Sequence, residues 1–159
     1  MYTTILLAAA LQDWERYSAH ALAARELAET LATGASSPLH VLSVYEYSPL
    51  PSTALPSEVV QYREDLMRRT DDLMGQKMHE YLAPLKAQGL EIASILRVGD
   101  PRDVIPEVAT TLKADLLILG SHSKRGLLDI VLGGTAQQVS KAAPCTVVLV
   151  SPKKDGGGG

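Results

Sequence analysis

The chain has 159 residues, 46% of them hydrophobic and 21% charged, with a formal net charge of −3 at pH 7. This length suits one domain with a substantial core, and the negative net charge argues against general nucleic-acid binding, which needs a basic face. The single cysteine, Cys145, excludes an internal disulfide and favours a reducing, cytoplasmic location, while no apolar stretch approaches the roughly 20 residues of a membrane helix.

The first part of the chain alternates apolar runs with a helical pattern. Residues 5–10 and 39–45 form short apolar runs, and each run predicts a strand that is buried on both faces of a sheet. Between them, hydrophobic residues recur at spacings of three and four, which predicts a helix that ends near Gly34. The stripe on this helix consists of Trp14, Tyr17, Ala21, Ala24, Ala28 and Leu31.

The middle of the chain predicts a loop, a long helix and a strand. Three prolines in residues 46–57 indicate a mobile loop, and Ser57 is predicted to be the N-cap of the helix that follows. This helix ends near Gly89, and Pro84 is expected to distort its last turns. Its stripe consists of Val59, Leu66, Leu73, Met78, Leu82 and Leu85. Residues 90–98 then alternate in hydrophobicity and predict a third strand.

The last third of the chain contains two further helices and two strands. Asp100 followed by Pro101 is typical of an N-cap with proline at the first helical position. Residues 115–119 and 146–150 are apolar runs that predict the fourth and fifth strands. A fourth helix is predicted between them, beginning around Thr135 and stopped by Pro144.

This alternation predicts an α/β fold with one five-stranded parallel sheet, right-handed crossovers and helices on both faces. The common strand orders are 3-2-1-4-5 and 2-1-3-4-5, and we expect the first. In that order strands one and four are neighbours, and a ligand crevice lies between their carboxyl ends. Gly120 ends the fourth apolar run at this place, and the Gly133-Gly134 pair precedes the next helix. Glycines and free N–H groups at a helix N-terminus favour a phosphate, and hence a nucleotide.

At these residues the chain resembles the universal stress protein family. Nucleotide-binding members of that family carry glycine, two residues, glycine, nine residues, and glycine followed by serine or threonine. Here Gly120 is followed by Ser123 in the second glycine position, then by Gly133, with Gly134 in the Ser/Thr position and Thr135 one step further. The resemblance implies a Rossmann-like, adenine-nucleotide α-hydrolase-like domain over residues 1–152, with residues 153–159 as a flexible tail.

The resemblance also implies a set of nucleotide-binding positions. Ala10 stands where ATP-binding relatives carry an acidic residue at the end of strand one, and Val44 stands where the backbone meets adenine. Lys124 and Arg125 either cover the phosphates or form a solvated loop face. The complete set is Ala10, Val44, Gly120, Ser121, His122, Ser123, Lys124, Arg125, Gly133, Gly134 and Thr135.

From this resemblance we expect a cytoplasmic stress-response or signalling protein that binds ATP, ADP or AMP, with Mg²⁺ accompanying the nucleotide. A homodimer through the C-terminal strand is also implied. The sequence contains no Walker loop, GxSxG elbow or metal-ligand cluster, so we expect no dedicated catalysis and at most weak ATP hydrolysis. The alternative is a nucleotide-free interaction module of the same fold, and Ala10 together with the loop substitutions motivates it.

Overall fold

Helices and strands alternate along the whole of the described chain. The computed structural model describes residues 2–12, 19–49, 56–120 and 134–151, and their order is βαβαβαβαβ, as the sequence predicts. The elements are β1 (Ile5–Ala8), α1 (Ala19–Ala35), β2 (Leu39–Tyr45), α2 (Pro56–Ala87), β3 (Ile92–Val98), α3 (Pro101–Thr111), β4 (Leu116–Gly120), α4 (Gly134–Ala142) and β5 (Thr146–Val150).

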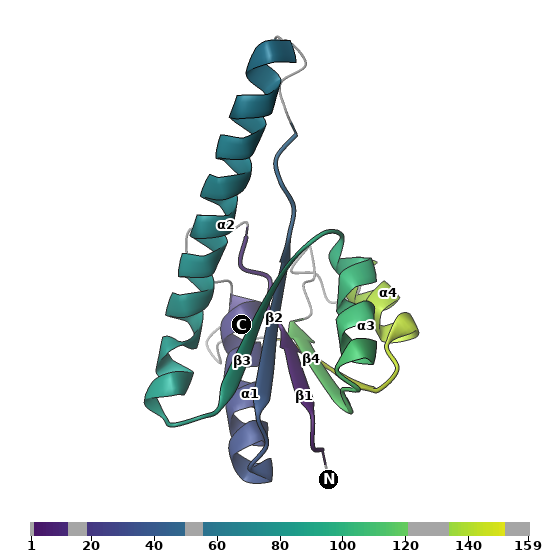
Figure 1. The fold of residues 1–159 in the computed structure, drawn as a ribbon. Helices are drawn as coiled ribbons and strands as arrows, with labels where there is room; N and C mark the ends of the chain where they lie inside the picture. Colours follow the sequence, from purple (N-terminus) through teal and green to yellow (C-terminus); the bar gives the residue numbers. More distant parts are fainter. Residues whose placement is uncertain (1, 13–18, 50–55, 121–133, 152–159) are drawn as a thin grey trace, which may run out of the picture.

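All five strands are parallel and form one sheet in the order β3-β2-β1-β4-β5. Strand β1 lies at the centre, where Ala8 pairs with Leu42 of β2 on one side and with Leu119 of β4 on the other (Figure 1). Strands β3 and β5 form the two edges. The predicted strand order is therefore confirmed, and so is the edge position of the last strand.

Both faces of the sheet are covered by helices, and this explains why the strands read as continuous apolar runs. Successive residues of a strand point to opposite faces. Ile5 and Leu7 of β1 pack in the cluster that α1 and α2 complete, whereas Leu6 and Ala8 pack in the cluster that α3 and α4 complete. All four side chains are buried, so neither face of β1 has room for a polar residue.

Helix α1 lies against the sheet through small residues. Its fully or almost fully buried residues are Ala21, Ala24, Ala28 and Ala32. The first three belong to the predicted stripe, and Leu31 of that stripe is half-buried at the margin of the same cluster. Because alanine side chains are short, the backbone of α1 can approach the strands closely. Trp14 and Tyr17, the first two residues of the stripe, lie outside the described residues.

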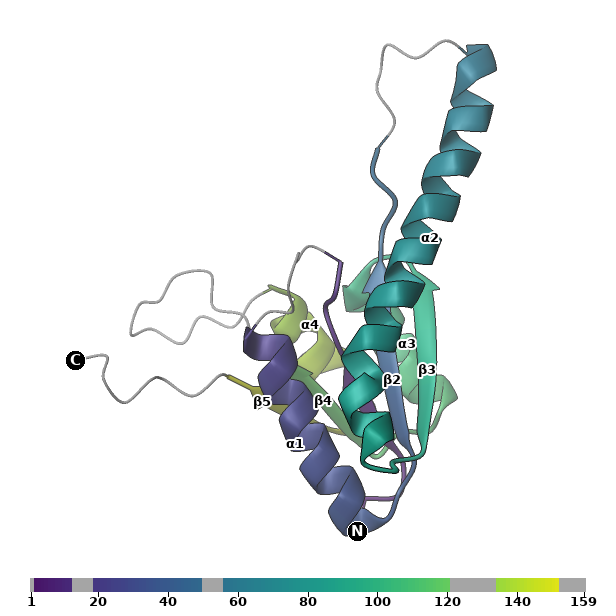
Figure 2. The ribbon, with the colours of Figure 1, turned by 90° about the vertical axis from the view of Figure 1, so that its left-hand side faces the viewer.

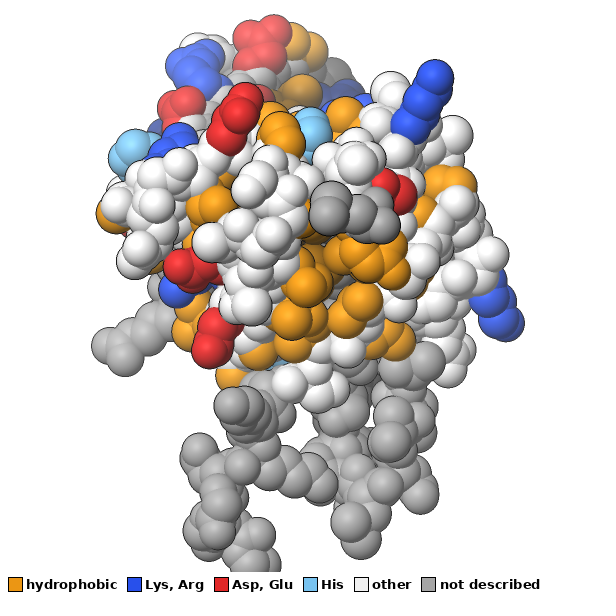
Figure 3. Space-filling model, turned by 90° about the horizontal axis from the view of Figure 1, so that it is seen from below, with side chains coloured by type: hydrophobic (Ala, Val, Ile, Leu, Met, Phe, Trp, Pro, Cys, Tyr) orange, Lys and Arg blue, Asp and Glu red, His pale blue; other side chains and the backbone are white. Residues whose placement is uncertain are grey.

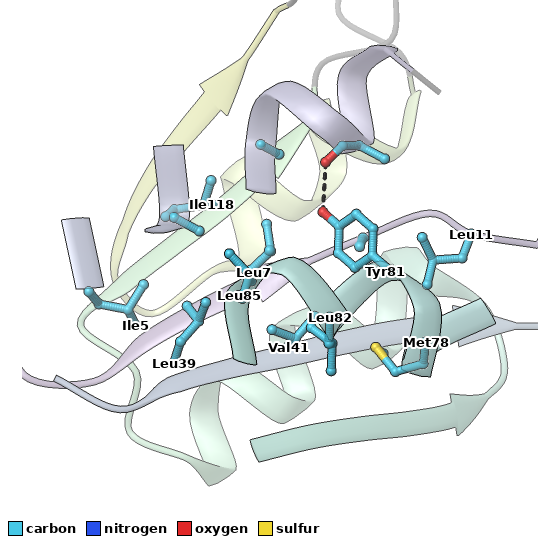
Figure 4. Packing of buried hydrophobic residues seen from close by; sticks show 14 of the residues in the cluster. Ile5, Leu7, Leu11, Leu39, Val41, Met78, Tyr81, Leu82, Leu85 and Ile118 are labelled. Carbon is cyan, nitrogen blue, oxygen red and sulfur yellow. Dashed lines mark hydrogen bonds between the residues drawn. The ribbon is translucent and has the colours of Figure 1, made fainter. Parts of the chain in front are cut away.

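Helix α2 has 32 residues, which corresponds to a length of about 48 Å. Its amino-terminal half projects beyond the carboxyl ends of the strands (Figures 1 and 2). Its carboxyl-terminal half packs on the sheet, where Met78, Leu82 and Leu85 are buried as predicted (Figure 4). The prediction for Leu73 is wrong, because this side chain is 49% exposed. Met74 faces the core instead, since it lies one full turn before Met78, and Leu73 points about 100° away.

The start of α2 differs from the prediction, whereas its end agrees with it. The helix begins at Pro56, so Ser57 lies inside its first turn and is not the N-cap. Proline suits the first turn because the N–H that it lacks has no intrahelical partner there. The helix ends at Ala87, close to the predicted end near Gly89, and Pro84 lies inside it. A distortion of the last turns by Pro84 stays a prediction. The chain then turns at Gly89, where a φ of 82° favours glycine.

Helix α3 begins as the sequence predicts. Asp100 has an extended backbone, and its carboxylate accepts a hydrogen bond from the backbone N–H of Arg102 at 2.9 Å, while Pro101 is the first helical residue. The Arg102 guanidinium also donates to this carboxylate at 2.6 Å. These bonds hold the pKa of the Asp100 carboxyl below its ordinary value. The cap therefore fixes the direction in which the chain leaves β3.

The amino-terminal end of the sheet is apolar in its middle. Figure 3 views the molecule from below Figure 1, and hydrophobic side chains gather in the centre of this face while charged side chains lie nearer its margin. Among the described residues, no helix is long and apolar enough to cross a membrane.

Candidate functional site

The winding of the sheet reverses at β1. The chain runs from β1 through α1 to β2 on one side, and it returns to the other side of β1 only at β4. In such sheets a crevice opens at the carboxyl ends of the strands where the winding reverses. Ala10 follows β1, Gly120 ends β4, and Gly134 begins the helix that leads from β4 to β5, so the chain order places these three predicted site positions on this side of the sheet. Both neighbouring strands are buried up to that point.

Ala10 lies just beyond the last residue of β1 and is exposed, whereas Ala9 before it is only 4% exposed. A methyl group cannot accept a hydrogen bond from a ribose or a base. Ala10 therefore offers no polar side chain at the end of β1, and its contact with a ligand stays a prediction.

Val44 lies near the carboxyl end of β2. Its side chain is half-buried and packs at the margin of the cluster formed with α3 and α4. Two residues earlier, the Leu42 carbonyl accepts a hydrogen bond from Ala9 N–H at 2.8 Å. Main-chain groups of a strand alternate between its two sides, so Val44 directs its N–H and its carbonyl toward the side of β1 as well. Strand β1 ends at Ala8, so the main-chain groups of Val44 lie beyond the last ladder pair of β1 and β2, and their contact with a base stays a prediction.

Gly120 is required by the packing of α1 against β4. A Cβ atom at this position would lie 2.9 Å from the His20 Cβ and 3.3 Å from the His20 backbone carbon. Cβ atoms in proteins essentially never lie 2.9 Å from another carbon atom, and His20 could move away only if the backbone of α1 shifted. The close approach of α1 thus accounts for this glycine by itself, and a role of Gly120 in anion binding stays a prediction.

The start of α4 has the opposite character. Gly134 is exposed, and a Cβ atom there would meet no atom within 4 Å. Nothing in the described packing requires a glycine at this position. The first N–H groups of a helix have no intrahelical partner, and together with the helix dipole they attract an anion. Thr135 is half-buried next to it, and Ala136 and Val139 anchor the helix in the core.

The remaining predicted site residues fall on the segment between β4 and α4. Ser121, His122, Ser123, Lys124, Arg125 and Gly133 lie outside the described residues. Their contact with a ligand stays a prediction, and so does the flexible tail at residues 153–159, of which the structure describes none.

The structure adds a polar clamp at this edge that the sequence analysis missed. The Gln12 carboxamide donates from Nε2 to the Glu46 carbonyl at 2.5 Å and accepts from the Glu46 N–H at 2.9 Å. The Lys77 ammonium of α2 donates to the Leu11 carbonyl at 3.0 Å and to the Gln12 carbonyl at 2.8 Å. These bonds join the exit of β1 to β2 and α2. The bonded main-chain groups are far away in the sequence, so no local sequence pattern predicts these hydrogen bonds.

A second polar cluster lies at the carboxyl end of β2, where side chains of this segment contact α2. The Tyr45 and Tyr47 hydroxyls both donate to Asp71 Oδ1, at 2.6 and 2.7 Å, and the two rings meet edge to face. Burial, together with the bond to Asp71, raises the pKa of the Tyr45 hydroxyl, and the bond to Asp71 is the main reason why the pKa of Tyr47 is raised. Beyond it lies an open hollow of about 330 Å³. Its lining residues are Tyr47, Ser48, Pro49, Arg63, Leu66 and Met67.

No group of three or more histidine, cysteine, aspartate or glutamate side chains that could hold a metal ion occurs among the described residues.

The comparison with known proteins fits this geometry. The sequence profile of the universal stress protein family matches residues 1–151, nearly the whole chain. The chain belongs to the universal stress protein family. A universal stress protein of Thermus aquaticus is 33% identical over 150 residues, which cover 94% of this chain and 99% of the relative. Universal stress protein MJ0531 of Methanocaldococcus jannaschii is 32% identical, over 72% of this chain and 67% of the relative.

Some family relatives match over part of their length only. Universal stress protein MJ0577 of Methanocaldococcus jannaschii is 28% identical over 62% of this chain, and the aligned part covers 61% of the relative. The chain spans about a fifth of the universal stress protein E homolog of Haemophilus influenzae, with 41% identity over 59 residues.

Solved structures of universal stress proteins share the fold. The structure of MJ0577 superposes with a TM-score of 0.75 at 24% identity, and the match covers 98% of this chain and 99% of that protein. A universal stress protein that was solved in complex with cAMP superposes with a TM-score of 0.56 at 20% identity, over 96% of this chain and 98% of that protein. At this level of identity the likeness establishes the Rossmann-like arrangement of the strands and helices.

Proposed function

We propose that this universal stress protein binds an adenine nucleotide in the crevice between the carboxyl ends of β1 and β4, and that it works as a cytoplasmic sensor in stress response or signalling. The observation that carries the proposal is the open start of α4 at Gly134. This glycine is exposed, a Cβ atom there would meet no atom within 4 Å, and it is the first residue of a helix, where free N–H groups favour an anion. A family member solved with cAMP supports an adenine nucleotide as the ligand class.

In this proposal the ligand spans the crevice. The base forms hydrogen bonds with the main-chain N–H and carbonyl of Val44, and the ribose lies over Ala10. The phosphates accept hydrogen bonds from the N–H groups of Gly134 and Thr135. Ser121, His122, Ser123, Lys124, Arg125 and Gly133 are proposed to complete the phosphate site, and Gly120 to shape its floor. A di- or triphosphate would bring Mg²⁺ with it.

The proposal does not include dedicated catalysis. Hydrolysis of a phosphoanhydride needs a group that orients or deprotonates water within hydrogen-bond reach. Ala10 supplies no such group at the position where a carboxylate would lie over the ligand. We therefore expect ATP turnover, if measured, to be weak, and to lie far below the range of about 1–100 s⁻¹ that is typical of kinases.

A screen of thermal stability with ATP, ADP, AMP and cAMP tests the proposal. A ligand that binds only the folded state stabilises it by about 2.7 kcal/mol at a concentration of 100 Kd. We expect at least one adenine nucleotide to raise the melting temperature in a concentration-dependent way. If no adenine nucleotide changed the melting temperature at millimolar concentration, the result would contradict the proposed function.

A second candidate function is a nucleotide-free interaction module of the same fold. The specific observation in its favour is Ala10, which leaves the ligand side of β1 without a carboxylate. Analysis of the gently purified protein separates the two functions. Released adenine nucleotide in a near-stoichiometric amount supports the first, whereas its absence together with a flat nucleotide titration supports the second.

We also propose that two copies assemble through β5. This strand lies at the sheet edge, and its residues from Val147 to Val150 are half-buried rather than buried. An uncovered strand edge invites pairing with another strand, and a two-fold axis lets one surface pair with itself. Light scattering at micromolar concentration should give twice the 17.0 kDa of one chain. A mass of 17.0 kDa would contradict the dimer.

A further inference from the structure

The edge of β2 continues beyond the point where β1 ends. Among the described residues, Ala9 N–H forms the last main-chain bond from the β1 side, to the Leu42 carbonyl at 2.8 Å. On the other side of β2, the Tyr45 carbonyl accepts from Gly99 N–H at 3.0 Å. In β2, residues with even numbers therefore direct their main-chain groups toward β1, and residues with odd numbers direct them toward β3. Val44 and Glu46 are the next two even-numbered residues, and both lie past the end of β1.

At Glu46 the role of a neighbouring strand is taken by one side chain. The Gln12 carboxamide pairs with both the Glu46 N–H and the Glu46 carbonyl, at 2.9 and 2.5 Å. A main-chain amide in an adjacent strand would offer the same donor and acceptor. Lys77 fixes the backbone at Leu11 and Gln12 from the side of α2, so the carboxamide is presented from an anchored segment.

We infer that Gln12 is a positioning residue that sets the base specificity of the crevice. Val44 lies between two fixed points, the hydrogen bond at Leu42 and the Gln12 clamp at Glu46. These two points hold the backbone at Val44, whose N–H and carbonyl both point toward the side of β1. The inference rests on the proposed function, because it assumes that a nucleotide base uses this edge.

The chemistry of the edge selects adenine over guanine. A backbone carbonyl accepts from the adenine 6-amino group, and the adjacent N–H donates to adenine N1. Guanine presents an acceptor at O6 and a donor at N1, so each of its groups would face a group of the same kind. Sites built to form such hydrogen bonds discriminate strongly, because an unmatched partner leaves buried polar groups unpaired. The discrimination depends on a rigid edge, and Gln12 supplies that rigidity at its outer end.

Isothermal titration of the full-length protein with ADP, GDP and inorganic tripolyphosphate tests this inference. Gln12→Met keeps the length of the side chain but removes both hydrogen bonds. We expect it to weaken ADP binding by about tenfold, the effect of roughly 1.4 kcal/mol, and to lower the ratio of ADP to GDP affinity. Tripolyphosphate binding should stay unchanged, because the phosphate end of the crevice is not touched. Gln88→Met is the matched control, since Gln88 is exposed in the turn after α2 at the opposite end of the sheet.

Gln12→Glu adds a readout that a merely structural role would not move. A carboxylate accepts from the Glu46 N–H but repels the Glu46 carbonyl, whereas a protonated carboxyl group can donate and accept as the carboxamide does. We expect ADP affinity of this variant to match that of Gln12→Met at pH 7.5 and to approach that of the parent protein, measured at the same pH, as the pH falls to about 4, where a glutamate carboxyl is ordinarily protonated.

The outcomes separate this inference from the proposed function. If the parent protein binds ADP and Gln12→Met binds it with the same affinity and the same preference over GDP, the role of Gln12 is overturned and the nucleotide site stands. A parallel loss of ADP and tripolyphosphate binding also overturns it, because general damage would then explain the result. If the parent protein binds no adenine nucleotide, the proposed function fails and the inference fails with it.

Discussion

The Tyr81 hydroxyl donates a 2.6 Å hydrogen bond to the Ala21 carbonyl, and this bond joins α2 to α1 inside the core (Figure 4). Tyr81 is fully buried. The Arg25 guanidinium of α1 lies 5.2 Å from the centre of its ring and donates to its backbone carbonyl at 3.0 Å. The two helices that cover one face of the sheet are therefore held together by polar contacts as well as by apolar packing.

We predict that Tyr81→Phe destabilises the protein by about 1 kcal/mol, because it removes this bond and leaves the packing of the ring in place. Urea unfolding measures the change. Tyr62→Phe is the control, since Tyr62 is half exposed on the projecting part of α2 and should show no comparable loss. Equal stability of the two variants would show that the bond contributes nothing measurable.

The cluster of Tyr45, Tyr47 and Asp71 predicts a dependence of stability on alkaline pH. Burial and the Asp71 carboxylate raise the folded-state pKa of Tyr45 above the ordinary value near 10. The folded protein therefore holds this proton more tightly than the unfolded chain does, and the corresponding stability is present below pH 10 and is lost as the pH rises above it. Urea midpoints between pH 8 and 11 should fall more steeply for the parent than for Tyr45→Phe. Parallel curves would contradict this account.

The two described glycines at the crevice should respond in opposite ways to alanine. Gly120→Ala places a Cβ 2.9 Å from the His20 Cβ, so we expect a loss of about 1–3 kcal/mol in unfolding free energy. Gly134→Ala meets no atom within 4 Å and removes a flexible residue from a helix, so stability should be unchanged or rise by up to about 1 kcal/mol.

Nucleotide affinity gives the second readout for this pair. Gly134→Ala should weaken ADP binding at least severalfold, because its methyl group narrows the approach of phosphate to the helix N-terminus. If a stable Gly134→Ala protein bound ADP with unchanged affinity, the phosphates would not lie at the start of α4.

Much of the fold could be predicted because strands that are buried on both faces of the sheet consist of consecutive apolar residues. The apolar runs of β1, β4 and β5 and the Asp100-Pro101 cap are local signals, and each appears where predicted. The order of the strands follows from crossover rules and the limited set of doubly wound sheets. Sequence reasoning misplaces Leu73 because an apolar residue next to the true stripe looks like a member of it until the helix axis is fixed.

The candidate site is less predictable. Gly120 resembles a ligand-binding glycine in the sequence, yet the structure shows a tight packing contact with His20 at the same place. Gln12 and Lys77 carry no signal, because their partners are main-chain atoms at Glu46 and Leu11 that only the sheet register and the placement of α2 bring near. Side-chain bonds to distant backbone depend on the assembled fold and leave no periodic pattern.

Restoring a carboxylate at the end of β1 should strengthen nucleotide binding. Ala10 is exposed at the crevice, so Ala10→Asp does not bury the new charge before the ligand arrives. A hydrogen bond to a charged group contributes about 1.5–3 kcal/mol, reduced by the desolvation of the carboxylate on binding. Calorimetry should therefore show a gain in adenosine-nucleotide affinity of about tenfold. Weaker binding of ADP by Ala10→Asp would mean that the ribose does not lie over β1.

Amide chemical shifts of the isotope-labelled protein during a titration with ADP test the central claim most directly, because they report binding and its location together. We predict saturable changes at Ala10, Val44, Gly134 and Thr135, with little change at Gln88 at the opposite end of the sheet. A spectrum that stays unchanged at millimolar ADP would contradict nucleotide binding. Changes confined to the hollow lined by Tyr47, Arg63 and Met67 would contradict the crevice as the site.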